Sequence, residues 1–469
     1  MTDKINIDKV FKLALENHYL NNFQKAQNLY NKVLQVEPAH INANNNLGAI
    51  FLALGDYHKA KNYFEIVIKI DPKNIDAHNN LGVTFKALNK DHEAINCYEE
   101  VIKIDPNFVA AYNNLGQVFF KLKKYKNSQN YFEKAIKVNP NHKDAHNNLG
   151  TLLLELGEYQ KAISCYNKTI KIDPNYTLGY YNLGIIFGDY LGQLKKSKEC
   201  YEKVISIDVN YSDAYWNLYT TTSNIDEALS ILKKLCKIDS KHIRSQIIIS
   251  ILEYYKGNFN EFNNILNTTD SNHPYIRSAE WIFSLPELPK IFFNRWDFFD
   301  AIILLTDITR PFYEFGVWNG VSFKYLVNTL KEGFGFDTFT GLPESWYKES
   351  KGAYSSYGVV PSIEGGEFIV GKFEDTLPKF FSTERPVASL INFDADLYSS
   401  TLCALDYASK VIDEKTILIF DELIMNDNWE QDEFKALNEF CTNGGFSYEV
   451  LAVSFSTKQV ALRLNKQNG

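Results

Sequence analysis

The chain has 469 residues, and this length predicts more than one hydrophobic core. Hydrophobic residues make up 45% of it and charged residues 23%, which is ordinary for a soluble globular protein, and no run approaches the roughly 18 apolar residues of a membrane span. The net charge of −8 falls on residues 274–469, where about 17 Lys and Arg face about 28 Asp and Glu, and such a half should repel a polyphosphate backbone, which argues against a nucleic-acid substrate.

The start of the chain is polar from Met1 to Asp8 and lacks the apolar segment of a secretory signal. Six cysteines are scattered along the sequence, and none of them forms a C-x-x-C pair. This usage predicts reduced thiols in a cytoplasmic protein.

The first half carries an internal repeat of 34 residues. The period is kept by five prolines, by five Leu-Gly pairs and by one aromatic position. The prolines are Pro38, Pro72, Pro106, Pro140 and Pro174. The glycines of the Leu-Gly pairs are Gly48, Gly82, Gly116, Gly150 and Gly184. The register slips by one residue near Asp189–Gly192 and then resumes.

This pattern predicts two antiparallel helices per repeat. A small residue such as Gly48 lets the helices approach, an aromatic residue such as Phe64 fills the groove, and Pro ends the second helix. One pair cannot bury its own apolar face, so the pairs should stack into an α-solenoid. The residues and the period resemble the tetratricopeptide repeat over roughly residues 5–240, and we assign residues 1–271 to the solenoid.

An asparagine precedes each of the five Leu-Gly pairs. The set is Asn46, Asn80, Asn114, Asn148, Asn182 and, after the slip, Asn217. In solenoids of this type the position faces the concave groove, where an amide ladder could hold an extended peptide of a partner protein. The alternative is that these side chains satisfy their neighbours within the array.

From about Asn272 the repeat pattern is lost, and we expect helices over 272–310 that join the solenoid to a domain at 311–469. There the pattern changes to short apolar runs, which predict strands. The runs are 312–317, 333–336, 367–370, 387–393, 416–420, 448–455 and 459–464. Continuous apolar runs favour a mostly parallel, Rossmann-like α/β sheet covered on both faces, and the last two runs predict a C-terminal antiparallel hairpin. This is the layout of class I methyltransferases.

Ligands of such sheets bind at the carboxyl ends of the strands. The first run ends at Gly316, which allows close approach of a ligand, and Gly320 allows a tight helix start. The second run ends at Asp337, where an acid can accept hydrogen bonds from both ribose hydroxyls of an adenosine cofactor. The first turn lacks a phosphate cradle with Lys-Ser/Thr, which disfavours ATP.

Carboxylates gather where the fourth and fifth predicted strands end. They are Asp394, Asp396, Asp421 and Glu422. Unpaired, these groups would repel one another, so a hard divalent cation such as Mg²⁺ is the expected partner, with Asp394, Asp421 and Glu422 as ligands. All nine histidines lie at or before His273, so the second half offers neither a His ligand nor a His base. The alternative is that Asp394 and Asp421 cap the following helices.

Four segments together resemble the macrocin O-methyltransferase family. They begin at Glu314, Phe336, Gly371 and Phe393, and the resemblance covers roughly residues 290–469. It implies binding of S-adenosylmethionine, metal ligation by the tips at Asp394 and Asp421, and O-methylation of a hydroxyl group, often on a sugar. The residues that it implies for the cofactor are Glu314, Phe315, Gly316, Gly320, Asp337, Phe339, Phe373, Glu374 and Asp375. Glu422 departs from the Asp or Asn that is usual beside the Asp of strand five.

The sequence therefore predicts an S-adenosylmethionine-dependent O-methyltransferase. In the expected mechanism a metal at Asp394 binds the acceptor hydroxyl, Asp396 removes its proton, and the oxygen attacks the methyl group in line. The repeats are expected to recruit a partner or a glycan-bearing substrate. Two alternatives are an interaction scaffold that binds cofactor without turnover and a methyltransferase that modifies protein side chains.

Overall fold

The computed structural model describes residues 6–466, and the chain divides into two compact units between Gly179 and Tyr180. Helix α11 (Thr177–Ile185) crosses this division. The division therefore falls inside the predicted repeat array, and the last repeat helices belong to the same unit as the α/β domain.

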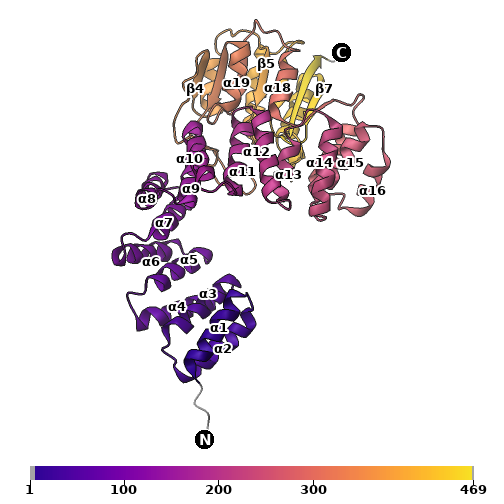
Figure 1. Cartoon of the computed structure of the whole chain (residues 1–469). Helices are drawn as coiled ribbons and strands as arrows, with labels where there is room; N and C mark the ends of the chain where they lie inside the picture. The colour runs from indigo at the N-terminus through magenta and orange to yellow at the C-terminus, as the bar shows by residue number, and fades with distance from the viewer. Residues whose placement is uncertain (1–5, 467–469) are drawn as a thin grey trace. The chain divides into compact units, whose positions relative to one another are not determined.

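The first unit consists of helix pairs that begin every 34 residues along the chain (Figure 1). The pairs are α1 (Ile7–Tyr19) with α2 (Phe23–Val36), α3 (Ile41–Ala53) with α4 (Tyr57–Ile70), α5 (Ile75–Ala87) with α6 (Asp91–Ile104), α7 (Val109–Lys121) with α8 (Tyr125–Val138), and α9 (Lys143–Glu155) with α10 (Tyr159–Ile172). Each second helix ends two residues before the repeated proline, as the missing amide of proline predicts.

Each Leu-Gly glycine lies against the aromatic ring of its own repeat. A β-carbon on Gly116 would stand 2.4 Å from Phe132, and the corresponding distance from Gly48 to Phe64 is 2.6 Å. These separations are shorter than any van der Waals contact, so a larger residue would push the two helices apart. The predicted close approach at this position is confirmed.

The second unit begins with an irregular repeat. Helix α11 runs into a π-helical turn, η1 (Ile186–Tyr190), in which the Leu191 amide donates to the Ile186 carbonyl at 3.1 Å. A π-turn accommodates one extra residue in a helix, which is the physical form of the one-residue slip in the sequence. The helices that follow are α12 (Leu194–Ile207), α13 (Ser212–Tyr219), α14 (Ile225–Ile238), α15 (Ile243–Tyr255), α16 (Asn260–Thr268) and α17 (Pro274–Phe283).

The rest of the second unit is an eight-stranded sheet with the order β1-β7-β8-β6-β5-β2-β3-β4. Its strands are β1 (Lys290–Phe292), β2 (Phe312–Phe315), β3 (Gly333–Asp337), β4 (Gly366–Val370), β5 (Leu390–Phe393), β6 (Ile417–Phe420), β7 (Phe446–Ser454) and β8 (Gln459–Lys466). Strands β2 to β6 are parallel, and β8 is antiparallel to both β6 and β7. The predicted fold class is confirmed.

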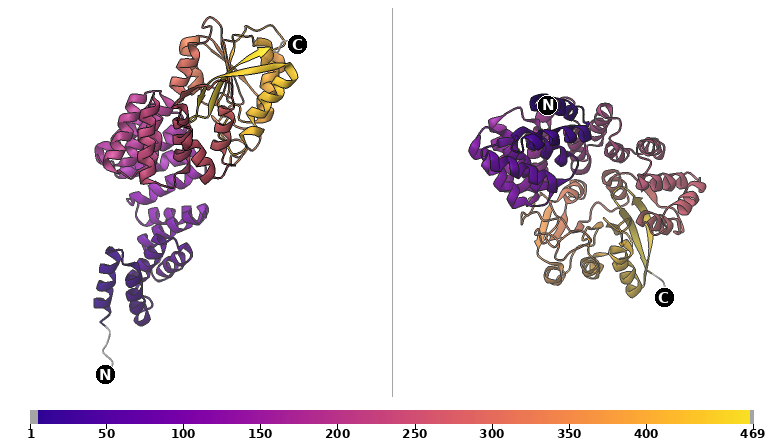
Figure 2. Two further views of the ribbon diagram at one scale, coloured as in Figure 1. Left: turned by 90° about the vertical axis from the view of Figure 1, so that its right-hand side faces the viewer. Right: turned by 90° about the horizontal axis from the view of Figure 1, so that it is seen from below.

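Helices cover both faces of this sheet (Figure 2). They are α18 (Arg295–Ile303) and α19 (Val321–Leu330) on one face, and α20 (Phe373–Phe380), α21 (Tyr398–Ala408) and α22 (Glu433–Gly444) on the other. Short 3-10 turns, η2 (Ser409–Val411) and η3 (Trp429–Gln431), complete the unit. Because side chains alternate along a strand, Phe312 and Glu314 of β2 point to the α18–α19 face while Tyr313 and Phe315 point to the other.

The segment 272–310 differs from the helical segment that the sequence predicted. It contains α17 and α18, but residues 290–292 between them form β1, which pairs in parallel with β7 at the edge of the sheet. The strand is only three residues long and lies between helices, so its sequence has no readable period.

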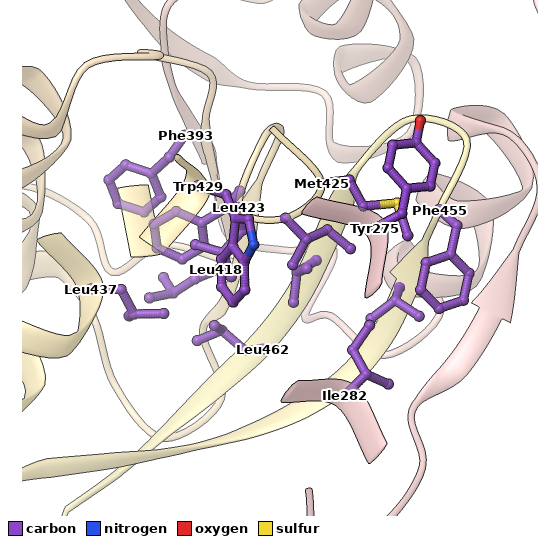
Figure 3. Packing of buried hydrophobic residues seen from close by; sticks show 14 of the residues in the cluster. Tyr275, Ile282, Phe393, Leu418, Leu423, Met425, Trp429, Leu437, Phe455 and Leu462 are labelled. Carbon is purple, nitrogen blue, oxygen red and sulfur yellow. The ribbon is translucent and has the colours of Figure 1, made fainter. Parts of the chain in front are cut away.

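The core of the second unit runs without a break from the repeat helices into the sheet. Tyr275 and Ile282 of α17 belong to the same buried cluster as Phe455 and Leu462 of the C-terminal hairpin (Figure 3). This packing fixes the last helices of the array against the α/β domain. None of the helices between residues 6 and 466 has the length and apolarity to cross a membrane. All six cysteines are free thiols.

Candidate functional site

The candidate site lies where the strand order reverses, between β2 and β5. Counted from β2, the parallel strands follow the doubly wound order 3-2-1-4-5, and in such sheets the crevice at the reversal holds the ligand. A cavity of about 270 Å³ opens there, which we call cavity A. The predicted residues on its wall are Gly316, Asp337, Phe373, Glu374, Asp394, Asp396, Asp421 and Glu422.

Gly316 is the residue that lets the backbone of β2 turn beside cavity A. It has a φ of +91°, and a β-carbon there would stand 1.8 Å from the carbonyl oxygen of Asp394. Its amide donates to the Phe336 carbonyl at 2.9 Å, which holds the turn against β3. Gly316 therefore lies in close contact with the backbone of Asp394, and no residue with a side chain fits at this position.

Asp337 holds two loops together at the edge of cavity A. Its Oδ2 accepts the amides of Val317 (2.8 Å) and Trp318 (2.7 Å), and its Oδ1 accepts the amide of Phe339 (2.6 Å). A carboxylate has about four acceptor positions, so one remains after these three bonds. Asp337 can thus anchor the loops and still accept a hydrogen bond from a ligand in the cavity.

Glu314 lies beneath the cavity instead of on its wall. The side chain is fully buried, and its Oε1 accepts a hydrogen bond from the Ser322 hydroxyl of α19. Burial raises the pKa of Glu314 to about 8, although the hydrogen bond from Ser322 opposes the shift. We therefore expect a neutral carboxyl group here below pH 8, in place of an exposed anion that contacts the cofactor.

Four other predicted cofactor residues also lie away from cavity A. Phe315 is buried and stacks between Phe336 and Phe393, with ring centroids 4.8 and 5.4 Å away. Phe339 is buried against Phe368, Gly320 forms the left-handed start of α19, and Asp375 is exposed in the first turn of α20. These residues do not line cavity A, and nearby residues of the same segments form its wall.

Carboxyl groups converge at the tips of β5 and β6. Burial first, and then the neighbouring acids, raise the pKa values of Asp394 and Asp396 well above the ordinary range, and burial raises that of Asp421. Asp396 also has a φ of +60°, an uncommon backbone state for a residue other than Gly. Glu433, which the sequence did not single out, adds a fully buried carboxyl group whose pKa is raised by burial and then by the charges of the other acids.

Two cations of the chain face these acids. A guanidinium nitrogen of Arg295 lies 3.7 Å from Oδ2 of Asp421, and Nζ of Lys458 lies 3.1 Å from Oε1 of Glu422. Asp421 also accepts a hydrogen bond from Gln459 at 2.5 Å. Neither cation was predicted, because Arg295 lies in the segment before the Rossmann motifs and Lys458 in the terminal hairpin.

The residues present do not fit the predicted divalent cation. Between residues 6 and 466 no group of three or more His, Cys, Asp or Glu side chains is placed to hold a metal ion. The predicted ligands Asp421 and Glu422 each already face a cation of the chain, Arg295 at 3.7 Å and Lys458 at 3.1 Å.

Aromatic and basic residues that the sequence did not predict complete the wall of cavity A. They are Trp318, Tyr354 and Lys372, together with Arg295. Trp318 (φ +50°) and Tyr354 (φ +56°) have left-handed backbones, and their rings meet edge to face at 6.4 Å. Backbone strain of this kind concentrates at functional sites, but it has no signature in the sequence.

A second cavity of about 400 Å³, cavity B, lies between the irregular repeat and the α/β domain. Its walls include Asp189 from η1, Trp216 and Asn217 from α13, and Trp296 from α18. Five residues line both cavities, namely Arg295, Trp318, Asp394, Asp421 and Glu422. The two cavities therefore meet at the acidic tips of β5 and β6.

The asparagine ladder forms contacts between adjacent repeats. The Asn114 amide donates to Asn79 (3.2 Å), the Asn148 amide to Asn113 (2.9 Å), and, after the slip, the Asn217 amide to the Tyr181 hydroxyl (3.1 Å). Each bond reaches the preceding repeat, so the structural alternative is confirmed at these three positions.

Comparison with known proteins identifies the repeats. Solved structures similar to the chain include MamA (25% identity, 36% of this chain and 97% of that one, TM-score 0.32) and YrrB, a tetratricopeptide-repeat protein with an unusual peptide-binding site (23%, 39% and 95%, 0.32). A tetratricopeptide repeat protein from Parabacteroides merdae is 17% identical and covers 53% of this chain and 98% of its own, with a TM-score of 0.43. No curated protein matches the chain. Tetratricopeptide-repeat models match residues 19–79, 84–123, 108–175 and 179–211, so the chain carries these repeats over 19–211.

Proposed function

We propose that the α/β domain is an S-adenosylmethionine-dependent O-methyltransferase that acts on a hydroxyl group, often one of a sugar. The observation that carries the proposal is the convergence of separate predicted segments on cavity A: Gly316 after β2, Asp337 after β3, and Phe373 at the start of α20. Their side chains or backbone meet at the reversal point of a doubly wound sheet, where a nucleoside cofactor binds in folds of this type.

The walls of cavity A suit the cofactor. Gly316 places backbone without a side chain on the wall, Asp337 retains an acceptor position for a ribose hydroxyl, and the Phe373 ring offers an apolar surface. The carboxylates at the tips of β5 and β6 favour a cationic sulfonium over an anionic cofactor. When bound, the cofactor would supply the methyl group.

Within this proposal the acids at the strand tips act on the acceptor. Asp396 lines cavity A and can accept the proton of an acceptor hydroxyl as the oxygen attacks the methyl carbon. Arg295 lines both cavities beside Asp421, where it can donate a hydrogen bond to the acceptor oxygen.

The tetratricopeptide repeats of residues 19–211 support a second part of the proposal, namely that the array recruits a peptide or protein partner. Because the ladder amides are engaged between repeats, such a partner would be held mainly by other groups of the array. The acidic charge of residues 274–469 argues against nucleic acid as the partner of the α/β domain.

Titration calorimetry of the full chain with S-adenosylmethionine tests the cofactor. We expect saturable binding by the wild type, and a loss of roughly 10- to 100-fold in affinity for Asp337→Ala, because a charged hydrogen bond and the loop anchor are both removed. Asp406→Ala, an exposed aspartate of α21, is the matched control and should bind normally. A thermal melt of each variant separates lost binding from lost folding.

A transfer assay with labelled S-adenosylmethionine on cell extract tests the reaction. Counts in the glycan or small-molecule fraction that depend on Asp396 support the proposal. Counts in protein would favour a side-chain methyltransferase, and binding without any transfer would favour the interaction scaffold. The absence of cofactor binding by the folded wild type would reject both catalytic forms of the proposal.

A further inference from the structure

We propose that the methyl acceptor enters through cavity B, so that the irregular repeat of the array supplies one wall of the acceptor site. The acceptor that fits this cavity is a polyhydroxylated compound, such as a glycoside, that is uncharged or carries an amine and has no phosphate. The inference rests on the function proposed above, because cavity B is an acceptor site only if cavity A takes the methyl donor.

The irregular repeat is adapted to build this wall. The Gly188 carbonyl lies in this π-turn, where the regular α-helical hydrogen-bonding pattern is interrupted. The Trp296 indole donates to that carbonyl at 2.5 Å. A β-carbon on Gly192 would stand 3.3 Å from the same indole. The extra residue thus brings η1 against α18 and places Asp189 on the wall of cavity B. Single π-turns within helices frequently occur at functional sites.

The chemistry of the wall fits a polyhydroxylated ligand. Trp216 and Trp318 are half-buried and present indole rings, on which the apolar C–H face of a sugar can lie. Asp189, Asn217 and Thr220 stand on the same wall and provide acceptors and donors for hydroxyl groups. Ligand hydroxyl groups can donate to the carboxyl group of Asp189, which a purely apolar ligand cannot do.

The charge of cavity B excludes a phosphorylated ligand. Four acids line it, Asp189, Asp394, Asp421 and Glu422, whereas the cations on the wall are Arg295 and Lys458. Both cations already face carboxylates of the site, at 3.7 Å and 3.1 Å. A phosphate group would meet net negative charge in a partly closed cavity, where repulsion is screened less than in water.

The shared wall gives the geometry of transfer. Because Asp394, Asp421 and Arg295 line both cavities, an acceptor in cavity B reaches the same strand tips as a ligand in cavity A. In the transfer step the hydroxyl oxygen forms a bond to the methyl carbon, the sulfur–carbon bond breaks, the sulfonium becomes a neutral thioether, and the hydroxyl proton passes to a carboxylate such as Asp396. Donor and acceptor then enter from opposite sides of the acidic cluster.

Saturation-transfer NMR of the full chain with a panel of methyl glycosides tests the proposal. We expect at least one glycoside to bind the wild type, and the corresponding sugar phosphate to bind at least about tenfold more weakly. Trp216→Ala and Asp189→Asn should weaken glycoside binding by about tenfold and by a few-fold, while Asp213→Asn, an exposed aspartate of α13, leaves it unchanged. The isosteric Asp189→Asn keeps the test valid if Trp216→Ala unfolds.

Calorimetry of the same variants with S-adenosylmethionine distinguishes this inference from the proposed function. Unchanged cofactor affinity together with weakened glycoside binding supports an acceptor site in cavity B. Glycoside binding that is the same in wild type, Trp216→Ala and Asp189→Asn would overturn it, as would a wild type that binds cofactor but no glycoside, or one that prefers the sugar phosphate. A wild type that binds glycoside but no cofactor rejects the proposed function and, with it, the role of cavity B as acceptor site.

Discussion

The repeat helices and the carboxyl edge of the sheet both enclose polar side chains, but they satisfy them in opposite ways. In the repeats the enclosed groups are uncharged amides, and Asn114 and Asn148 each donate to a residue one repeat earlier. At the sheet edge they are carboxyl groups whose charges repel one another, at Asp394, Asp396 and Glu433. The first arrangement adds stability, whereas the second reduces it at neutral pH.

This difference separates structural from functional polar groups. An amide ladder is locally consistent with its fold, because each donor has its acceptor and no charge is enclosed. Carboxyl groups that repel, beside the left-handed backbones of Trp318 and Asp396, break those local rules together at one place. Such violations are expected where chemistry is selected at the expense of stability.

The two regions can be followed separately in one sample. All six tryptophans lie after residue 179, at Trp216, Trp281, Trp296, Trp318, Trp346 and Trp429. Tryptophan fluorescence therefore reports unfolding of the second unit alone, while hydrogen exchange of the peptides from α7 to α9 reports the repeats.

The largest expected effect follows from Glu314→Gln. Burial raises the pKa of Glu314 from 4.5 to about 8 in the folded protein, so the folded state favours the protonated form. The stability that this preference contributes is present below pH 4.5 and is lost as the pH rises to 8. Glutamine stays neutral, so the variant should be more stable than the wild type at pH 8 by roughly 2–4 kcal/mol.

Guanidinium unfolding followed by tryptophan fluorescence between pH 5 and 9 measures this difference. Glu414→Gln, at an exposed site between α21 and β6, is the matched control and should keep the pH dependence of the wild type. Parallel pH profiles of wild type and Glu314→Gln would show that Glu314 is ionised in the folded protein. Its burial would then not reduce the stability of the second unit at pH 8, which would contradict the difference drawn between the two regions.

A smaller effect, of about 1–2 kcal/mol, is expected for Lys458→Gln. The ammonium group lies 3.1 Å from Glu422 and opposes the rise in the pKa of Asp396. Without it the repulsion among the acids is stronger, so fluorescence-detected stability should fall at pH 8. It should fall by less at pH 5, because burial and the neighbouring acids raise the pKa of Asp396 and its negative charge decreases as the pH falls. Lys466→Gln, exposed at the end of β8, is the control. Equal losses at both pH values would assign Lys458 a role in packing alone.

The sequence predicted those parts of the molecule that repeat or alternate. The 34-residue period located the helix pairs and the one-residue slip, and the apolar runs located seven of the eight strands. Gly316 and Asp337 both lie on the wall of cavity A, because the ends of parallel strands meet at one edge of the sheet. A local sequence pattern was enough to predict helices and strands in which equivalent residues recur at a fixed spacing.

The rest of the site depends on alternation and on distant segments. Phe315 and Glu314 are neighbours of Gly316 in the motif, but their side chains point to opposite faces of the sheet and neither lines cavity A. Arg295 and Lys458 reach the acids from outside the predicted motifs, one before β2 and the other after β7. Charge partners of this kind are set by tertiary packing, which no local pattern contains.

The smallest expected effect belongs to the repeats and completes the comparison. Asn148→Ala removes a 2.9 Å hydrogen bond to Asn113, which should cost about 0.5–1.5 kcal/mol at every pH, because no titrating group is involved. Alanine also has a higher helix propensity than asparagine, so the result is read against Asn127→Ala, an exposed position of α8 that receives the same gain. Hydrogen exchange of α7–α9 should accelerate in Asn148→Ala relative to this control, with the fluorescence transition unchanged. If the two variants are equally stable, the ladder amide contributes nothing to the array, and a role for Asn148 in holding a peptide becomes the better explanation of its place in the repeat.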